Sequence, residues 1–166
     1  MNTLAFIIDD SAVNIAVARL LLQRLGWTVE EFPSAIPMLE RLSEAEPAFM
    51  LLDISMPDMG GEEACRRIRS NPAWNAVRII AYTAHALDDE RQHYLACGFD
   101  DIITKPITVG SLSAAVGRAP GSPAPLARSE DLHAMPLESA FDYAPQPEHF
   151  DPAALRHDLF DSTPAL

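Results

Sequence analysis

The sequence predicts an α/β fold in which a five-stranded parallel sheet is doubly wound, so that helices cover both of its faces. Short, continuously apolar runs alternate five times with amphipathic stretches over residues 1–118. Continuous apolar strands between amphipathic helices are typical of a parallel sheet that is buried on both faces. Several of the apolar runs also end on polar side chains, at the edge where such sheets bind ligands.

Each element is predicted from its apolar pattern and its flanking turn residues. Strands are expected at 4–8, 28–32, 48–52, 77–82 and 99–103. Helices are expected at 11–25, 35–45, 61–70, 86–97 and 108–117. Gly26 and Gly98 are expected to end the first and fourth helices, because glycine readily adopts the left-handed conformation that closes a helix.

The helical spacing of large apolar residues also predicts which faces of two helices pack inward. In the first helix these residues are Val13, Val17, Leu20, Leu21 and Leu25. In the fourth helix they are Leu87, Tyr94 and Leu95.

The composition changes after Arg118. Residues 119–166 contain eight of the fourteen prolines, eight acidic residues and two arginines. Such a segment is too poor in apolar residues to build a core, so we expect a mostly irregular acidic C-terminal extension. The predicted domains are therefore 1–118 and 119–166. Within the extension, 151–161 has the pattern of a short amphipathic helix.

The overall composition restricts the classes of function. The formal net charge of −12 disfavours direct binding to DNA and to anionic membranes. The N-terminus has no signal-peptide pattern, and no apolar run has the length of a membrane span. Cys65 and Cys97 form neither a close pair nor a metal-binding spacing. We therefore expect a soluble, cytoplasmic protein.

Five side chains with chemical potential follow the predicted strands. Asp9 and Asp10 follow the first strand, Asp53 the third, Thr83 the fourth and Lys105 the fifth. Three carboxylates in one cleft need either raised pKa values or a cation. Oxygen ligands of this kind favour magnesium. Lys105, the single lysine among twelve basic residues, adds a compact ammonium.

This set of groups predicts phosphoryl transfer to a carboxylate. Asp53 is expected to attack phosphorus, with magnesium and Lys105 offsetting the developing charge. Thr83 is expected to donate a hydrogen bond to a phosphoryl oxygen.

Four motifs, in this order, resemble the receiver domain of two-component response regulators over residues 3–118. They are IIDDSAVN at 7–14, LLDISMPDMGG at 51–61, AYTA at 81–84 and DDIITKP at 100–106. The resemblance implies a flavodoxin-like receiver fold, with Asp53 as phosphoacceptor, Thr83 as switch hydroxyl and Lys105 as phosphate clamp. It also implies a cis Lys105–Pro106 peptide. The implied magnesium ligands are the carboxylates of Asp9, Asp10 and Asp53 and the backbone carbonyl of Ser55.

The resemblance also implies partners. The phosphodonor would be a sensor histidine kinase or a histidine phosphotransfer protein, since the first motif looks more like receivers of hybrid kinases and phosphorelays. Phosphorylation would switch contacts with a downstream protein or within a homodimer, by self-catalysed phosphotransfer and autodephosphorylation rather than by turnover of a substrate. Two features depart from the family pattern. Ile102 stands where many receivers have an aromatic reporter, and Gly60 before Gly61 is expected to loosen the start of a helix.

Two other functions compete with this interpretation. Haloacid-dehalogenase-like phosphatases also place a nucleophilic aspartate after a parallel strand. They generally need a second acid two residues later, where this chain has Ser55. The other alternative is a receiver-fold binding module that does not use phosphorylation, which the complete set of five site residues disfavours.

Overall fold

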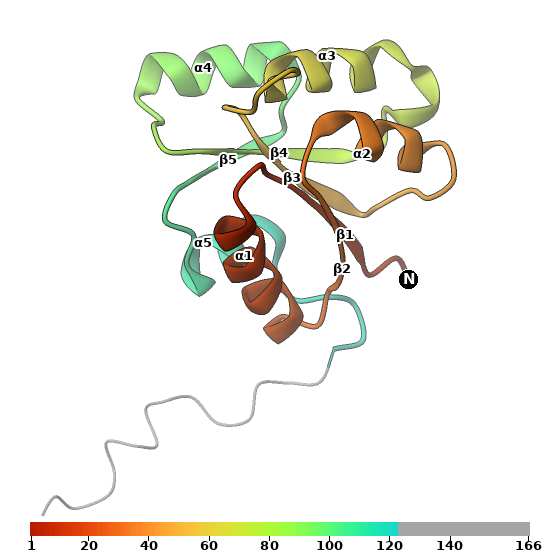
Figure 1. Ribbon diagram of the computed structural model, residues 1–166. Coiled ribbons are helices and arrows are strands. Elements are labelled where there is room, and N and C mark those ends of the chain that lie inside the picture. Colours follow the sequence, from red (N-terminus) through yellow and green to blue (C-terminus); the bar gives the residue numbers. More distant parts are fainter. Residues whose placement is uncertain (123–166) are drawn as a thin grey trace, which may run out of the picture. The chain divides into compact units, whose positions relative to one another are not determined.

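Five parallel strands form the central layer of the protein, in the order β2-β1-β3-β4-β5. The computed structural model describes residues 1–122, and the helix predicted at 151–161 lies outside them (Figure 1). The strands are β1 (Leu4–Ile8), β2 (Thr28–Phe32), β3 (Phe49–Asp53), β4 (Arg78–Thr83) and β5 (Asp101–Thr104). Every neighbouring pair is parallel, which confirms the predicted sheet.

The five predicted helices are all present, and each connects two strands or follows the last one. They are α1 (Ala12–Arg24), α2 (Ala35–Leu42), α3 (Gly61–Ser70), α4 (Asp88–Cys97) and α5 (Val109–Val116). A short 3₁₀ helix, η1 (Pro72–Trp74), was not predicted. Gly26 and Gly98 have positive φ angles of 87° and 112° where α1 and α4 end, as their positions in the sequence predict.

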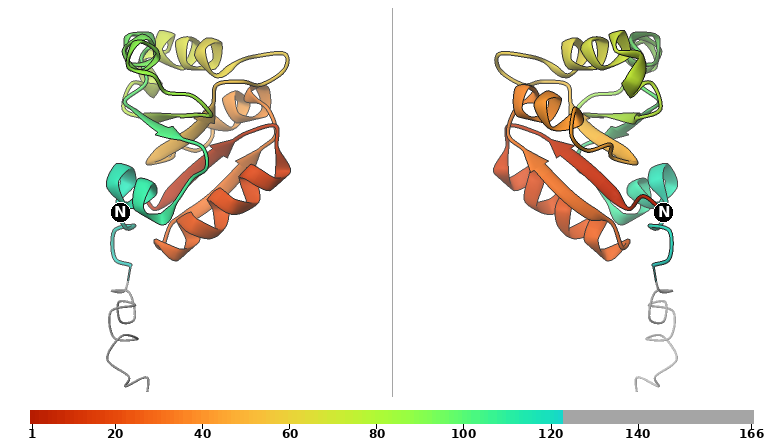
Figure 2. Two further views of the ribbon diagram at one scale, coloured as in Figure 1. Left: turned by 90° about the vertical axis from the view of Figure 1, so that its left-hand side faces the viewer. Right: turned by 90° about the vertical axis from the view of Figure 1, so that its right-hand side faces the viewer.

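The helices cover both faces of the sheet. Helices α2, α3 and α4 lie on one face, and α1 and α5 lie on the other (Figures 1 and 2). Successive side chains of a strand point to opposite faces, so each strand contributes to two cores. In β1, for example, Phe6 and Ile8 pack toward α2 and α3, while Ile7 packs toward α1. No described helix has the length and apolar character to cross a bilayer.

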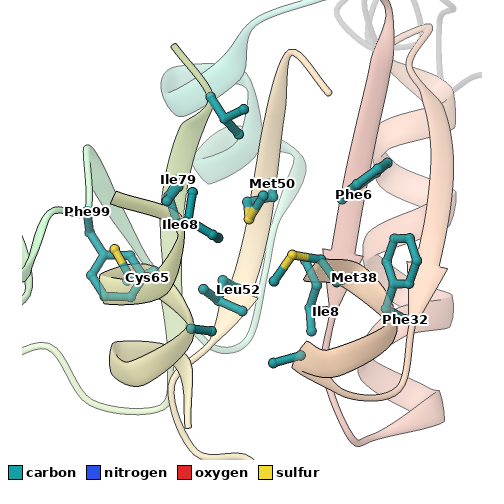
Figure 3. Close-up of a cluster of buried hydrophobic side chains, with 14 of the residues drawn as sticks. Phe6, Ile8, Phe32, Met38, Met50, Leu52, Cys65, Ile68, Ile79 and Phe99 are labelled. Carbon is teal, nitrogen blue, oxygen red and sulfur yellow. The ribbon is translucent and has the colours of Figure 1, made fainter. Parts of the chain in front are cut away.

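The larger core lies between the sheet and helices α2, α3 and α4. Figure 3 shows Met50 and Leu52 of β3 pointing into it between Met38 of α2 and Ile68 of α3. All four side chains are fully buried. This core fixes β3, whose last residue is Asp53, against the layer of helices above it.

The inward faces of α1 and α4 agree only in part with the predictions. Of the residues predicted for the first helix, Leu25 is buried and Leu21 packs at the edge of the core. In α1 the buried residues are Ile15, Ala18 and Leu22, whereas Val13 is 72% exposed and Leu20 is 59% exposed. The helix is apolar on most of its circumference, so its spacing did not identify the face that meets the sheet. Ile15, Ala18 and Leu22 are spaced by about one helical turn and form the face that packs on the sheet.

In α4, only Tyr94 of the three predicted residues is buried. Leu87 is 73% exposed, because it precedes the first turn, and Leu95 is 49% exposed.

The described chain continues to pack after α5. The backbone N–H of Ala119 donates to the carbonyl of Leu25 at 2.8 Å, so the chain leaves the domain beside the end of α1.

Two leucines of α1, Leu20 and Leu22, test which face of the helix is buried. Leu22→Ala is expected to lower the free energy of unfolding by about 3–5 kcal/mol, because it leaves a cavity in a close-packed core. Leu20→Ala is the matched control and is expected to change it by less than about 1 kcal/mol, since that side chain is exposed. Urea unfolding at equilibrium measures both values. Equal losses in the two variants would contradict this assignment of the buried face.

Candidate functional site

The parallel register brings the predicted site residues to the carboxyl edge of the sheet. Ile8 of β1 pairs with Leu52 of β3, so Asp9 and Asp53 follow side by side. Thr83 pairs with Thr104 at the end of β5, and Lys105 comes directly after it. The structure therefore brings together side chains that are up to 96 positions apart, Asp9 and Lys105, from opposite ends of the domain.

Asp9 is fully buried and has three polar partners. Its carboxylate accepts hydrogen bonds from the Ser11 backbone N–H at 2.8 Å and from Asn14 Nδ2 at 3.2 Å. Lys105 Nζ lies 3.1 Å from its Oδ2. Asn14 is within the first predicted motif, but sequence reasoning gave it no role. It holds the Asp9 carboxylate from the first turn of α1.

Asp53 is 2% exposed and shares the same ammonium. Lys105 Nζ donates to Asp53 Oδ1 at 3.1 Å, and the Ser55 backbone N–H donates to this oxygen at 3.3 Å. The ammonium also lies 4.7 Å from the centre of the Tyr82 ring, in the geometry of a cation–π contact. Lys105 is therefore positioned by two carboxylates and an aromatic face.

The electrostatics of the site follow from this crowding. Burial raises the pKa of the Asp53 carboxyl, and the nearby Asp9 carboxylate raises it further, against the opposing effect of Lys105. Burial lowers the pKa of Lys105, but its hydrogen bonds to Asp9 and Asp53 outweigh this and leave it raised. One ammonium thus faces two buried carboxylates, with Asp10 exposed beside them.

The three aspartates form a group that fits a divalent cation. Carboxylate oxygens of Asp9, Asp10 and Asp53 all lie within 4.8 Å of one another. Burial and the neighbouring Asp9 carboxylate together raise the pKa of Asp53, and the single Lys105 ammonium only partly opposes them. Magnesium prefers oxygen ligands and commonly binds through few carboxylates plus water, which this partly open group can accommodate.

Thr83 is the last residue of β4 and precedes the loop that leads to α4. It is 6% exposed, its hydroxyl accepts a hydrogen bond from the His85 backbone N–H at 3.3 Å, and its carbonyl accepts from the Lys105 backbone N–H at 2.7 Å. The Lys105–Pro106 peptide is cis, as the resemblance implies. Burial raises the pKa of the Tyr94 phenol, while the Thr83 hydroxyl acts in the opposite direction as its hydrogen-bond partner.

Tyr94 was predicted only as a core residue, and in the structure it also interacts with Thr83. It is an α4 side chain, and the Thr83 hydroxyl partly offsets the rise that burial causes in the pKa of its phenol. Its ring also makes an edge contact with Phe99 at 6.0 Å between centroids. Ile102, at the position where an aromatic reporter is usual, is 7% exposed and packs in the core.

The loop between β3 and α3 is closed by a glycine contact that sequence reasoning missed. The Gly61 backbone N–H donates to the Ile54 carbonyl at 3.0 Å. A Cβ at Gly61 would overlap the backbone carbonyl oxygen of Asp53. Gly61 is the first residue of α3, and its lack of a side chain lets it lie against the end of β3.

Comparison with known proteins agrees with the motifs and the fold. The chain matches the response regulator receiver domain family over residues 5–117. It is 34% identical over 111 residues to the aerobic respiration control sensor protein ArcB of Escherichia coli K12, a match that covers 66% of this chain and 14% of ArcB. The chain therefore corresponds to a small part of that relative's length.

Solved structures share the architecture. The chemotaxis protein CheY4 of Vibrio cholerae superimposes with a TM-score of 0.65 at 22% identity, covering 69% of this chain and 96% of CheY4. The receiver domain of sensor histidine kinase PA1611 from Pseudomonas aeruginosa has a TM-score of 0.63 at 28% identity and covers 69% of this chain and 94% of its own. That structure has a magnesium ion in its active-site cleft.

The raised pKa of Asp53 makes a prediction about stability. An acid whose pKa is raised by folding holds its proton to a higher pH in the folded state, so its ionisation costs stability above that pKa. In a chelating buffer at pH 7, Asp53→Asn is therefore expected to unfold at a higher urea concentration than the wild type. The difference should shrink as the pH falls through the acid range, because wild-type Asp53 then becomes protonated as well.

Magnesium should act in the opposite sense, because a bound divalent cation offsets the same repulsion. Adding it is expected to stabilise the wild type more than Asp53→Asn. The interpretation fails if Asp53→Asn is less stable than the wild type in chelator, or if magnesium stabilises both proteins equally.

Proposed function

Because the chain belongs to the response regulator receiver domain family, we propose that Asp53 accepts a phosphoryl group from a phosphohistidine, with Asp9, Asp10, Thr83 and Lys105 completing the reaction site. The receiver domain is a phosphoacceptor switch of two-component signalling. The observation that carries the assignment to Asp53 is its position. It is the buried carboxylate at the end of β3 that also contacts the Lys105 ammonium.

In the proposed reaction, an Asp53 carboxylate oxygen attacks phosphorus while the bond from phosphorus to the histidine nitrogen breaks. The electron pair of that bond leaves with the imidazole. Lys105 and the Ser55 backbone N–H hold Oδ1, which presents Oδ2 as the attacking oxygen. The ammonium then stabilises charge on the phosphoryl oxygens, and the Thr83 hydroxyl donates to one of them.

The carboxylates of Asp9, Asp10 and Asp53 would hold magnesium, with the backbone carbonyl of Ser55 as the further ligand that the family resemblance implies. When bound, the ion would supply positive charge beside the phosphoryl oxygens. The residues of the chain perform the remaining tasks. Asn14 and the Ser11 N–H fix the Asp9 carboxylate, so that it does not depend on the exposed Asp10 for its orientation.

The readout of phosphorylation is proposed to pass through Tyr94 rather than through residue 102. Donation of the Thr83 hydroxyl to a phosphoryl oxygen would compete with its interaction with the Tyr94 phenol. Tyr94 belongs to α4, so a change at Thr83 would bias the position of that helix. The buried Ile102 has no polar group with which to take part.

Access for a phosphodonor is proposed along α1. The exposed apolar residues Val13, Val17 and Leu20 form a stripe along one side of this helix, spaced by about one turn each. The stripe starts within the first turn after Asp9 and Asp10. We assign it to the phosphodonor, because the donor's phosphohistidine must come within bonding distance of Asp53 and this apolar stripe begins beside that site.

Acetyl phosphate tests the acceptor. Incubation with acetyl phosphate and magnesium is expected to add the mass of one phosphoryl group to the wild type and none to Asp53→Asn, measured by intact-protein mass spectrometry. Asp58→Asn, in the same loop, is the matched control and should be phosphorylated normally. Lys105→Ala is expected to slow the reaction by about 10²–10³-fold, because it removes a charge aimed at the phosphoryl group. Unchanged phosphorylation of Asp53→Asn would refute the proposal.

The role of the α1 stripe is tested by comparing the rates of phosphotransfer from a protein donor and from acetyl phosphate. Val17→Asp is expected to slow transfer from a phosphorylated histidine phosphotransfer domain by about tenfold, the equivalent of roughly 1.4 kcal/mol. It should leave the rate with acetyl phosphate unchanged, since that small donor needs no docking surface. Leu95→Asp is the control on α4 and should transfer normally from both donors. An equal effect of Val17→Asp on both donors would point to damage to the site instead.

A further inference from the structure

A second group of metal-ligating side chains lies between α3 and α4, outside the acceptor cleft. It consists of Glu62, His93 and Cys97, whose ligand atoms all lie within 4.8 Å of one another. His93 and Cys97 are four positions apart in α4 and so share one face of the helix. Glu62 faces them from the first turn of α3, which runs beside α4 (Figures 1 and 2).

The distances within this group match one face of a zinc tetrahedron. Glu62 Oε2 lies 3.1 Å from His93 Nε2, His93 Nε2 lies 3.7 Å from Cys97 Sγ, and Cys97 Sγ lies 3.9 Å from Glu62 Oε2. Bonds of about 2.0–2.1 Å to N or O and about 2.3 Å to S in tetrahedral geometry require ligand separations of roughly 3.3–3.6 Å. Each separation is thus within about 0.5 Å of that requirement.

We propose that Glu62, His93 and Cys97 bind a zinc ion, with water in the fourth position. The mixture of a thiolate, an imidazole and a carboxylate suits zinc rather than magnesium, which prefers oxygen ligands alone. The site is open to solvent: the side chain of Glu62 is 31% exposed and that of His93 is 57% exposed. An ion can therefore enter without a rearrangement of the fold, and one coordination position remains for water.

Binding requires two proton adjustments. The Cys97 thiol loses its proton to solvent as its sulfur bonds to the metal, and His93 binds through Nε2 with its proton on Nδ1. Arg66 also contacts Glu62 Oε2, at 3.4 Å, but both side chains are substantially exposed and such ion pairs are weak.

The other cysteine is not a ligand. Cys65 is fully buried, and burial raises its pKa to about 11, which keeps it a thiol. Its thiol donates a weak hydrogen bond to the Cys97 carbonyl at 3.7 Å, which holds the last turn of α4 against α3. A metal at the proposed site would join that last turn to the first turn of α3. Since α3 begins against the acceptor strand, the ion would restrain α4 relative to the acceptor loop.

Cobalt and zinc titrations of the full chain test the site. The reduced, metal-free protein is titrated with Co²⁺ in saturating magnesium, which occupies the aspartate group of the other site. One equivalent is expected to give a thiolate-to-cobalt absorption band, and Zn²⁺ should displace it. Cys97→Ser should abolish the band. Glu62→Gln and His93→Gln should each weaken Zn²⁺ binding by about tenfold or more in competition titrations.

Glu63→Gln provides the matched control, because Glu63 is the neighbour of Glu62 in α3 and pairs with Arg66 and Arg67. It should bind Zn²⁺ like the wild type. Circular dichroism checks that each variant is folded, and Glu62→Gln alters only a partly exposed surface group. The absence of a thiolate band would overturn the proposal. So would Zn²⁺ affinity that survives in all three ligand variants and is lost in Asp10→Ala, since the ion would then occupy the aspartate group.

Discussion

The parallel register of β1 and β3 puts two buried carboxylates, those of Asp9 and Asp53, next to each other. Their negative charges repel each other, and the rest of the site depends on this repulsion. The sheet cannot relax it, because both strands are packed between two layers of helices. Lys105 reaches across from the end of β5 and contacts both groups. One ammonium for two buried carboxylates leaves negative charge to be balanced, and that deficit provides affinity for a cation. The same rigidity would hold the Asp53 carboxylate in place for the proposed attack on phosphorus.

The sequence contained enough information to place the five predicted site residues at one edge. Asp9, Asp53 and Thr83 each end or follow an apolar strand, and parallel strands carry their last residues to a common edge. Only the order of secondary structure elements was needed for this inference. The supporting contacts were not accessible in the same way. The role of Asn14 depends on a rotamer, and the fit of Gly61 depends on the path of a loop.

The buried faces of α1 and α4 were predicted less well, for a physical reason. Spacing identifies a face only when the opposite face is polar, and α1 carries apolar residues on both. The small side chain of Ala18 meets the sheet while Leu20 faces solvent. The cluster of Glu62, His93 and Cys97 shows a related limit. Its carboxylate is 31 positions from its histidine, so only the packing of α3 against α4 brings them together.

The position of the chain's only lysine has a practical consequence for spectroscopy. Reductive methylation with ¹³C-formaldehyde would label Lys105 as the single side-chain amine, with the N-terminal amine as the only companion signal. Its dimethylammonium resonance would come from a group that lies beside Asp9 and Asp53 and over the ring of Tyr82. Ring-current shifts would make that resonance sensitive to small displacements of the ammonium. The molecule thus carries a built-in NMR reporter of what occupies its cleft.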